Sequence, residues 1–425
     1  MNQFSPVTRP ADDPVSADAG APGSVAATIA ALARIGRRAG GGVSRVAWSP
    51  ELFSAYDFVG NRMRELGLDV SIDAAGNLIG RWDVGTGAPV VVGSHLDTVP
   101  AGGAFDGAFG VVSAVHAVAR LKDEGFEPER PLWIVAFMDE EGTRFGAALF
   151  GSRAFTGEDV TGFAERVDAA GVSLRDAMAD AGFDVDRVGE AHAVGDVAAF
   201  LELHVEQGPV LEAEGLDIGV VTSIVGLRGY RVRLRGQANH AGTTPMHLRR
   251  DALVGAARIA LELRAFARSH EGVTANVGEL NVEPGGANVV PGLADFTIDV
   301  RAATDAGIAE LERQVEETVA TVAAEERLEA ELRRTFALDP VALDPELVAI
   351  VERAAAGEGA SWRRLPSGAG HDAMLVARCV PTAMVFVPSR DGISHSPEEH
   401  TTPAQAELGM RVLAATLRET LRRRR

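Results

Sequence analysis

One stretch of the chain decides the fold: residues 132–142 read LWIVAFMDEEG. The first seven residues are apolar without interruption and rich in β-branched and aromatic side chains, a pattern typical of a short strand buried on both faces of a sheet. The run ends in three consecutive carboxylates, Asp139, Glu140 and Glu141. Neighbouring residues at a strand end point in different directions, so one glutamate can bind a metal while the other faces a substrate. The stretch therefore predicts a buried strand with a chemical site at its carboxyl end.

Other short apolar runs share most of this pattern, at residues 89–92, 200–203 and 382–387. Segments with helical periodicity are expected at residues 108–124, 367–377 and 403–421. Strands that alternate with helices predict a mostly parallel sheet covered on both faces, so the expected fold class is α/β.

The pattern changes between about residues 222 and 338. Residues 230–235 alternate strictly, as a strand with one solvent-facing side does. The elements expected after it are a helix at 251–270, antiparallel strands at 273–282 and 296–301, a helix at 308–328 and a strand before Pro340. This β-α-β-β-α-β order is that of a ferredoxin-like α+β domain. The predicted division is a catalytic domain of residues 24–221 plus 339–425, an inserted domain of 222–338 and a disordered leader of 1–23.

The composition argues against several classes of partner. The 425 residues include 41 Lys and Arg against 60 Asp and Glu, a formal net charge of −19. Such a surface repels phosphate backbones and acidic headgroups, so neither nucleic acid nor a membrane is an expected partner. The single cysteine, Cys379, excludes an intramolecular disulfide, and no apolar run reaches the roughly 18 residues of a membrane span. We expect a cytoplasmic protein in which Cys379 is an inert core residue.

Each of the four apolar runs leads into side chains that bind metals. Besides the acidic cluster after residue 138, the first run leads to His95 and then to Asp106, which stands between glycine-containing segments. The third run leads to His204 and the fourth to His395. Ligands of open α/β sheets bind beyond the carboxyl ends of the strands, so these loops are expected to converge. Histidines and carboxylates gathered at one place predict a site for divalent metal ions.

The motifs in these loops resemble those of the dinuclear metal hydrolases that include aminoacylases and metallo-carboxypeptidases. They are GSHLDTV at 93–99, GGAFDG at 102–107, DEEGTRF at 139–145, ELHVEQG at 202–208, NHAGTTPM at 239–246, NVVPG at 288–292 and SHSPE at 394–398. The resemblance covers about residues 46–421. The chain is most similar to the amidase branch of N-carbamoyl-L-amino acid hydrolases, β-ureidopropionases and allantoate amidohydrolases, because His204 stands where the peptidase branches have a carboxylate.

The resemblance implies two divalent ions, with zinc preferred and manganese, cobalt or nickel as alternatives. The implied ligands are His95, Asp106, Glu141, His204 and His395. Asp106 would bridge the two ions. Glu140 would be the general base and then the general acid, and Asp97 would orient the ring of His95.

The resemblance also implies a set of substrate-binding residues: Gln207, His240, Asn288, Arg301 and Gly370. These would bind the amino-acid carboxylate and the scissile carbonyl. In the family the inserted domain is a lid that supplies three of them and pairs two subunits, so a homodimer is expected. Taken alone, the guanidinium fork of Arg301 suits a carboxylate, and His240 suits an oxyanion donor that reaches into another cavity.

The implied reaction is hydrolysis of the carbamoyl C–N bond of N-carbamoyl-L-amino acids to the amino acid, carbon dioxide and ammonia. Allantoate amidohydrolase is the nearest alternative, because allantoate shares the ureido group and the carboxylate. An aminoacylase or dipeptidase fits His204 less well, and a non-catalytic dimeric scaffold fits the intact ligand set least. The substrate is a small anion, which Arg301 and the two cations would attract in spite of the net charge. His371 is expected at a helix start behind the ligands and not among them.

Overall fold

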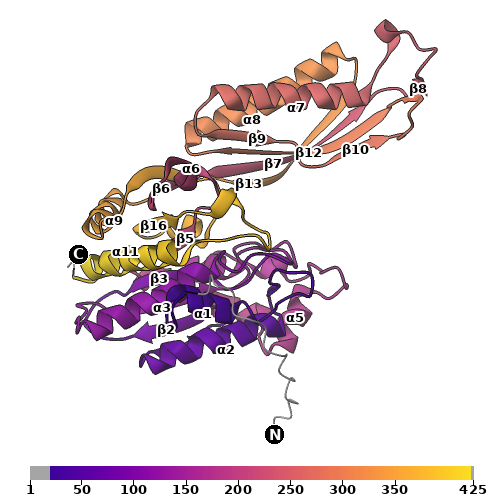
Figure 1. The fold of residues 1–425 in the computed structure, drawn as a ribbon. Coiled ribbons are helices and arrows are strands. Elements are labelled where there is room, and N and C mark those ends of the chain that lie inside the picture. The colour runs from indigo at the N-terminus through magenta and orange to yellow at the C-terminus, as the bar shows by residue number, and fades with distance from the viewer. Residues whose placement is uncertain (1–19, 423–425) are drawn as a thin grey trace.

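The structure, a computed structural model, describes residues 20–422. It has two parts, each with its own sheet and its own hydrophobic core (Figure 1). Most of the leader predicted for residues 1–23 lies outside the described residues. The predicted fold class, a mostly parallel-sheet domain with an inserted ferredoxin-like domain, is confirmed by the two sheets. The exact division of the chain at residues 222 and 338 stays a prediction.

The elements of the larger part come from both ends of the chain. Its helices are α1 (Val25–Leu32), α2 (Pro50–Glu65), α3 (Ala108–Asp123), α4 (Phe150–Thr156), α5 (Leu174–Asp180), α6 (Val210–Glu214), α9 (Pro345–Gly357), α10 (Asp372–Val376) and α11 (Pro403–Arg422). Its strands are β1 (Asp69–Ile72), β2 (Leu78–Trp82), β3 (Val90–His95), β4 (Leu132–Phe137), β5 (Ala199–Val205), β6 (Ile218–Ile224), β14 (Val341–Ala342), β15 (Trp362–Ser367) and β16 (Thr382–Val387).

The four apolar runs form neighbouring parallel strands at the centre of a nine-stranded sheet. The strand order is β1-β2-β4-β3-β5-β16-β6-β14, and β15 pairs in parallel with β6. Val90 of β3 lies opposite Leu132 of β4 and Ala199 of β5, and Thr382 of β16 lies opposite Phe200. Every residue of β3, β5 and β16 is buried, as their continuous apolar sequences predict. The four carboxyl ends therefore lie side by side at one edge.

Helices pack on this sheet and begin where the sequence supplies a capping side chain. α3 and α11 contact each other and the central strands, and α1, α2 and α9 flank them; α4 and α10 contact the sheet as a separate group. Ser49 caps α2 by accepting a hydrogen bond from the Leu52 amide, and Asp344 caps α9. None of the described helices is long and apolar enough to cross a membrane.

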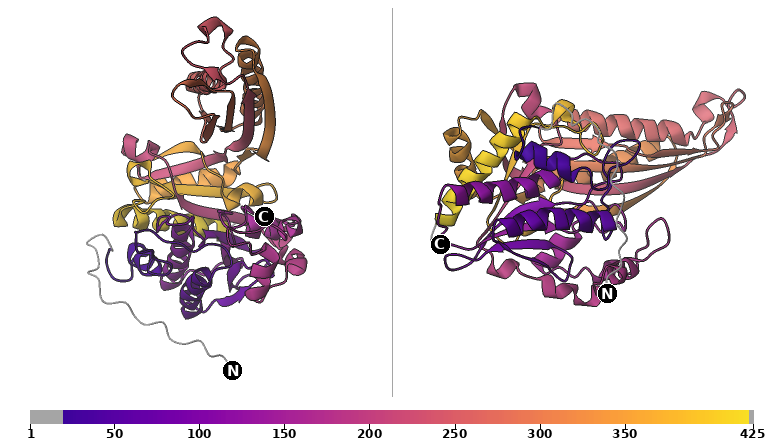
Figure 2. Two further views of the ribbon diagram at one scale, coloured as in Figure 1. Left: turned by 90° about the vertical axis from the view of Figure 1, so that its right-hand side faces the viewer. Right: turned by 60° about the horizontal axis from the view of Figure 1, so that its bottom comes forward.

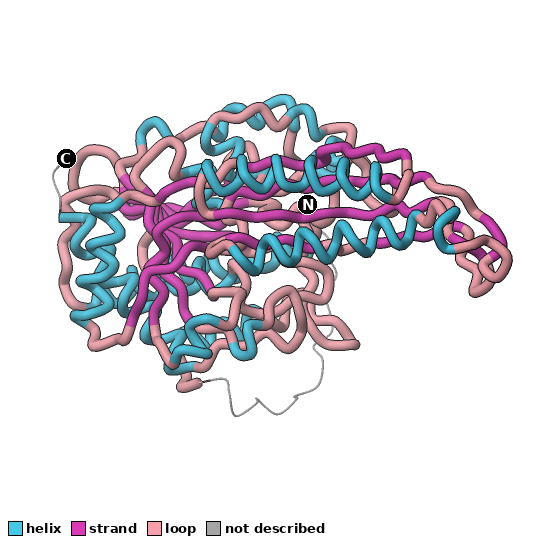
Figure 3. The backbone as a smooth tube through the Cα atoms, turned by 90° about the horizontal axis from the view of Figure 1, so that it is seen from above, coloured by secondary structure: helices cyan, strands magenta, loops and turns pink. Residues whose placement is uncertain are grey.

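The smaller part, which we call the lid, is a five-stranded antiparallel sheet with two long helices. Its elements are β7 (Gly226–Arg235), β8 (Asn239–His240), α7 (Ala252–Ser269), β9 (Val273–Asn276), β10 (Leu280–Glu283), β11 (Val289–Val290), β12 (Leu293–Ala302), α8 (Asp305–Glu325) and β13 (Glu329–Leu338). The strand order is β10-β12-β7-β13, with β9 also on β12, as a ferredoxin-like fold requires. Figures 2 and 3 show the lid as a separate body whose two helices lie along its strands.

Three local expectations are wrong. The strand expected at 273–282 is two strands, because Gly278 interrupts the run and the Glu279 amide bonds the Thr297 hydroxyl. The helix expected at 367–377 is the end of β15, a turn and the short α10, because glycines at 368 and 370 break the helical run. Cys379 is exposed, since it lies in the turn before β16 and not in the strand.

Candidate metal centre

The loops that follow β3, β4, β5 and β16 meet at the carboxyl edge of the sheet. His95 is the last residue of β3, and His204 lies one residue before the end of β5. The loop after β16 brings His395 to the same place. All three imidazoles surround Asp106, which lies just before α3. The structure thus gathers residues that lie up to 300 positions apart in the chain.

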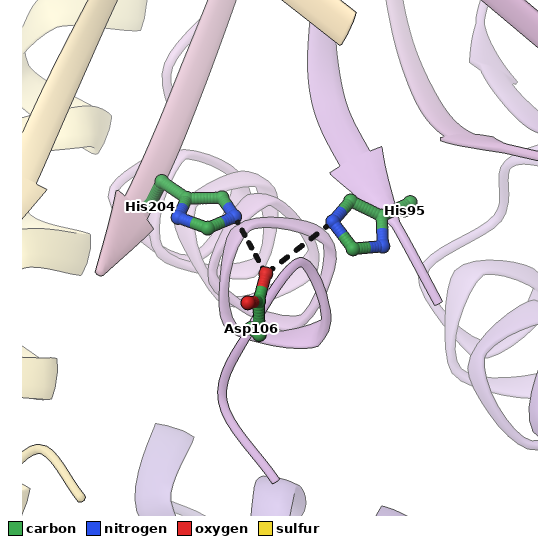
Figure 4. A group of neighbouring side chains, drawn as sticks. All are labelled: His95, Asp106 and His204. Carbon is green, nitrogen blue, oxygen red and sulfur yellow. Dashed lines mark ion pairs between the residues drawn. The ribbon is translucent and has the colours of Figure 1, made fainter. Parts of the chain in front are cut away.

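Asp106 divides the site into two halves. Its Oδ1 lies 3.5 Å from Nε2 of His95 and 3.2 Å from Nε2 of His204 (Figure 4). Its Oδ2 lies 3.1 Å from Nε2 of His395, which lies 3.6 Å from Oε2 of Glu141. We call the first group the inner half, because both its imidazoles are buried, and the second the outer half, because the side chain of His395 is 51% exposed.

These separations suit atoms that bind a common ion. Two donors at 2.0–2.2 Å from a tetrahedral zinc ion are about 3.3–3.6 Å apart. The nitrogen–oxygen distances around Asp106 run from 3.1 to 3.6 Å. In addition, Oε1 of Glu141 is buried and has no hydrogen-bond partner among the described residues. The residues present therefore fit two divalent ions that share the carboxylate of Asp106.

Main-chain carbonyls orient the two inner rings. Nδ1 of His95 lies 3.1 Å from the Asp97 carbonyl, and Nδ1 of His204 lies 2.9 Å from the Val205 carbonyl. A proton on each Nδ1 leaves a lone pair on Nε2, which faces Asp106. The carboxylate of Asp97 is 3.6 Å from His95 and instead accepts hydrogen bonds from the amides of Glu140 and Glu141. Asp97 thus positions the ring through its main chain and the two glutamates through its side chain.

The loops at this edge have unusual backbone conformations. Asp139, Gln207 and His395 have φ angles of 56°, 57° and 56°, in a left-handed region that non-glycine residues rarely adopt. Gly107 has φ 60°, and a Cβ there would lie 2.4 Å from the His95 ring. Only glycine leaves room for that imidazole beside the start of α3. Three of the strained positions therefore lie in the loops that form the site.

The charges at the site are strongly coupled. Burial opposes a charge on His95, but the carboxylates of Glu140 and Asp106 outweigh it and raise its pKa well above the ordinary value. Burial likewise opposes ionisation of Asp106, yet hydrogen bonds from the surrounding histidines hold its pKa well below the usual range. The hydrogen bond with Asp106 raises the pKa of His395 to about 9. In the ion-free protein, protons on these side chains occupy positions that divalent cations would take.

The two glutamates after β4 differ in position. Oε2 of Glu140 lies 3.8 Å from Nε2 of His95, and burial raises the pKa of Glu140 well above its usual range. Burial, together with the charge of Asp106, raises the pKa of Glu141 to about 7. Glu141 belongs to the outer half, whereas Glu140 stands beside the inner half. The second glutamate of the pair therefore suits a ligand, and the first suits a proton acceptor.

A third group of donors, Glu202, His204 and His371, is buried behind the inner half. Its atoms are already engaged, because both oxygens of Glu202 accept hydrogen bonds, at 2.7 and 3.1 Å. Nε2 of His371 lies 2.8 Å from the Ser367 hydroxyl. Burial lowers the pKa of His371 well below the ordinary value, so its ring is neutral. The group supports the centre and does not form another ion site.

Gln207 lies at the centre itself, and Arg301 and Gly370 lie where the lid meets the larger part. The Gln207 side chain donates a 2.8 Å hydrogen bond to Oδ2 of Asp106, so it reaches the centre itself. Nη1 of Arg301, on β12, donates a 2.8 Å hydrogen bond to the Gly368 carbonyl. Gly368 belongs to the same turn as Gly370. The structure therefore joins Arg301 to the turn that contains Gly370, through Gly368.

His240 and Asn288 lie elsewhere. Strand β8, which ends at His240, pairs with β11, and the Ala241 amide bonds the Asn288 carbonyl. This ribbon lies at the outer end of the lid (Figure 1). The structure places these two residues together but away from Asp106 of the same chain.

Sequence reasoning missed Glu399. Its Oε1 accepts hydrogen bonds from the Phe105 and Asp106 amides at 2.8 and 2.9 Å. Its Oε2 accepts one from the Ser394 hydroxyl, which also bonds Oδ2 of Asp106. Glu399 follows directly after the SHSPE motif, so the only signal was a second glutamate beside Glu398.

A parallel sheet that gathers three histidines and two carboxylates at its carboxyl edge, with an inserted lid, defines the class of metal-dependent hydrolases. Within that class the chain belongs to the Peptidase family M20/M25/M40, whose sequence model matches residues 91–419. The resemblance drawn from the motifs is thereby confirmed.

Known proteins are similar over nearly the whole chain. An N-carbamoyl-L-amino-acid amidohydrolase of Paenarthrobacter aurescens is 42% identical over 85% of this chain and 89% of its own. An allantoate amidohydrolase of Bacillus subtilis is 39% identical over 91% of this chain and 94% of its own. Among solved structures, an amidase of the hydantoinase/carbamoylase family from Burkholderia multivorans superimposes with a TM-score of 0.88 at 38% identity, covering 93% of this chain and 97% of that one.

Proposed function

We propose that this protein is a dinuclear metal-dependent amidohydrolase that cleaves the carbamoyl C–N bond of N-carbamoyl-L-amino acids to the amino acid, carbon dioxide and ammonia. The observation that carries the proposal is Asp106, whose two oxygens face separate groups of nitrogen and oxygen donors. The buried carboxylate of Glu140 beside them supplies a proton acceptor. The printed names of similar proteins supply the substrate class.

The chain's own residues divide the work of the reaction. Two divalent ions held by the inner and outer halves would polarise the scissile carbonyl and acidify water. Glu140 takes the proton from the attacking water at its carboxylate and returns it to the leaving nitrogen. Its carboxylate is buried, with Oε2 3.8 Å from Nε2 of His95, so one side chain stands beside the inner half for both proton transfers. Asp97 holds the amide of Glu140 and thereby the position of the base.

Substrate recognition falls to the boundary between lid and sheet. The guanidinium of Arg301 offers a planar fork that matches the carboxylate of the substrate. Gly370, in the adjoining turn, offers its main chain, and Gln207 stands at the centre itself. Closure of the lid over a carboxylate bound in this way would exclude water from the reaction.

His240 has the geometry of a hydrogen-bond donor. Its Nδ1 accepts hydrogen bonds from the amides of Gly242 and Thr243, at 3.0 and 3.2 Å. The neutral ring therefore carries its proton on Nε2, which suits a developing oxyanion. Since the ribbon lies away from Asp106 of its own chain, we propose that His240 and Asn288 enter the site of a second copy.

The lid surface favours such a homodimer. Leu261 of α7 is 63% exposed, and Leu253 and Val254 of the same helix are also exposed. Exposed apolar side chains gathered on one helix are typical of a protein interface. We expect two copies in solution for the wild type, and a shift toward one copy for Leu261→Glu, measured by light scattering during size-exclusion chromatography.

The test of the activity is ammonia release from N-carbamoyl-L-amino acids, N-carbamoyl-β-alanine and allantoate, with added zinc, manganese or cobalt. Glu140→Gln is expected to lower kcat by about 10²–10⁴-fold. Glu398→Gln, an exposed glutamate in the loop after β16, is the matched control and should retain the wild-type rate. Ammonia release at the wild-type rate from Glu140→Gln would show that another group is the base.

Allantoate is the second candidate substrate, favoured by the 39% identity to the Bacillus subtilis enzyme. The same screen separates the two, because the substrate with the highest kcat/KM identifies the activity. Turnover of N-acyl amino acids or dipeptides alone would indicate an aminoacylase or dipeptidase. Silence on every substrate with both ions bound would indicate a non-catalytic scaffold.

A further inference from the structure

The turn between β15 and α10, residues 367–371, contacts the lid on one side and the metal centre on the other. It begins at Ser367, where β15 ends, and ends at His371, the N-cap of α10. Ser367 and His371 are buried, whereas Gly368 is exposed at the surface that faces Arg301. A segment of five residues thus joins two parts of the site that belong to different domains.

On its inner side, the turn supports the ring of His204. The rings of His371 and His204 have their centroids 4.6 Å apart at an interplanar angle of 62°. Phe386 of β16 lies 5.7 Å from the His371 ring, so this imidazole is held between Phe386 and His204. The Ser367 hydroxyl fixes the far edge of the His371 ring, 2.8 Å from Nε2. The ring of His204 thus has two neighbours: the His371 ring packs against it, and Asp106 faces its Nε2.

On its outer side, the turn holds Arg301. Nη1 of Arg301 donates to the Gly368 carbonyl at 2.8 Å, while Nε donates to Asp299 on the same strand, also at 2.8 Å. Nη2 of Arg301 also donates to the Asp299 carboxylate, at 3.4 Å, so Gly368 and Asp299 together fix the orientation of the guanidinium. A substrate carboxylate that binds Arg301 would add a third acceptor to this guanidinium and so compete with Gly368 and Asp299 for its orientation. Binding at the lid changes the contacts of the turn that supports His204.

We propose that residues 367–371 form a positioning element that couples Arg301 of the lid to the metal-facing ring of His204. The inference rests on the proposed function, because it takes His204 as a metal ligand and Arg301 as the carboxylate receptor. His371 and Ser367 touch neither substrate nor ion; they act through His204. Binding of a carboxylate to Arg301 thereby changes the position of the His204 ring in the inner half of the metal centre.

The first experiment reads the metal centre directly. Cobalt(II) is loaded in place of the native ions, and its visible absorption reports the geometry of the ligands. Ser367→Ala and His371→Gln are expected to change this spectrum and to weaken cobalt binding by about 10–100-fold, as loss of a residue that orients a ligand does. Ser367→Thr keeps the hydroxyl and should restore the wild-type spectrum.

The matched control is another histidine paired with a hydroxyl. Nε2 of His116, on α3, lies 2.9 Å from the Thr28 hydroxyl, and this pair is part of neither half of the centre. His116→Gln should keep the wild-type cobalt spectrum and affinity. Unchanged spectra and affinities in both Ser367→Ala and His371→Gln would overturn the role of the turn. Should His371→Gln fail to fold, Ser367→Ala and Ser367→Thr decide the question alone.

The second experiment tests the coupling. Arg301→Gln and Ser367→Ala are combined, and kcat/KM is compared with that of each single variant. Residues that act independently multiply their losses, whereas a double variant that loses clearly less than the product shows coupling. Arg301→Gln combined with His116→Gln should give the simple product. A product relation for Arg301→Gln with Ser367→Ala would overturn the link to the lid.

A spectroscopic form of this test does not depend on turnover. A free L-amino acid, the proposed product, is added to the cobalt-loaded protein. Its carboxylate should shift the spectrum of the wild type but not that of Arg301→Gln, and Ser367→Ala should reduce the shift. Absence of ureido hydrolysis with this shift intact would refute the proposed function and leave the coupling standing. Hydrolysis without any shift would refute the coupling alone.

Discussion

The inner and outer halves of the metal centre share one carboxylate, yet they are built in different ways. The inner imidazoles are 2% and 1% exposed and belong to strands β3 and β5 of the central sheet. The outer imidazole, His395, is 51% exposed and lies on a loop in a left-handed backbone conformation. Main-chain carbonyls orient the inner rings, whereas His395 is oriented by the two carboxylates that it faces. The inner half is therefore preorganised by the main chain of the sheet, whereas in the outer half the imidazole contacts carboxylate side chains.

Asp106→Asn should impair ion binding in both the inner and the outer half, because it removes the carboxylate that they share. An amide cannot bridge two cations as a carboxylate does. Loss of both ions would forfeit several kcal/mol of transition-state stabilisation, so kcat/KM should fall by about 10³-fold or more. Metal analysis by mass spectrometry should find both ions lost. Retention of one ion per chain would instead show that the inner half holds its ion without Asp106.

His204→Ala and His395→Ala should separate the halves by their effect on the ion-free protein. Removing His204 takes away the acceptor of the Gly107 amide and the ring nitrogen that lies 2.9 Å from the Val205 carbonyl, both in a buried position. The free energy of unfolding should therefore fall by about 1–3 kcal/mol. His395→Ala should change it by no more than about 0.5 kcal/mol, since the side chain is half exposed. Urea unfolding in the presence of a chelator measures both, and equal losses would contradict the comparison.

Binding at the outer half should depend on pH. The pKa of His395 is raised to about 9 in the ion-free protein, so below that pH the imidazole carries a proton that an ion must displace. The affinity of the outer half should fall by about tenfold for each pH unit between about 9 and 7, where one proton is released for each ion bound, and more steeply below about 7, where Glu141 also carries a proton. Calorimetry in buffers of different ionisation enthalpy counts that proton. His395→Gln should lose it, and an unchanged proton count in that variant would assign the release to another group.

The sequence predicts the inner half better than it predicts the outer half, and the reason is physical. Short, β-branched apolar runs that alternate with helices are typical of buried parallel strands, whose polar ends meet at the carboxyl edge of the sheet. Residues His95 and His204 lie within or at the end of such runs. His395 follows its strand by eight residues. Its position depends on turns and hydrogen bonds that hydrophobic periodicity does not predict. The loop after the fourth apolar run made His395 a candidate metal-binding residue, but the run did not determine where that loop places it.

The errors of the sequence analysis have the same origin. The run at 367–377 has apolar periodicity, but its two glycines interrupt the helix, and a turn forms there. The strand at 273–282 has the right composition and still divides at Gly278. The place of His240 at the outer end of the lid follows from the length of β7, which periodicity leaves open. Glu399 was missed because its partners, the Phe105 and Asp106 amides, lie almost 300 residues away.

Glu399 gives the most sensitive test of how far the halves are independent. It holds the main chain of Asp106 and, through Ser394, one side of the Asp106 carboxylate. Glu399→Ala should weaken metal binding by about tenfold, the lower end of what loss of an orienting partner costs. Glu399→Gln keeps an acceptor for the amides and should lose less, and Glu398→Ala is the exposed control.

How the loss of metal affinity divides between the two ions is more informative than its total size. Because Asp106 is common to both halves, a change in its orientation should lower the affinity of the two ions by similar factors. Ser394 adjoins His395, so a loss confined to the outer ion would mean that Glu399 acts through this neighbour and not through Asp106. Titration with cobalt, followed by the visible absorption of each half, distinguishes these outcomes. Equal losses of affinity would show that the orientation of the Asp106 carboxylate controls ion binding in both halves, although only the inner half is preorganised.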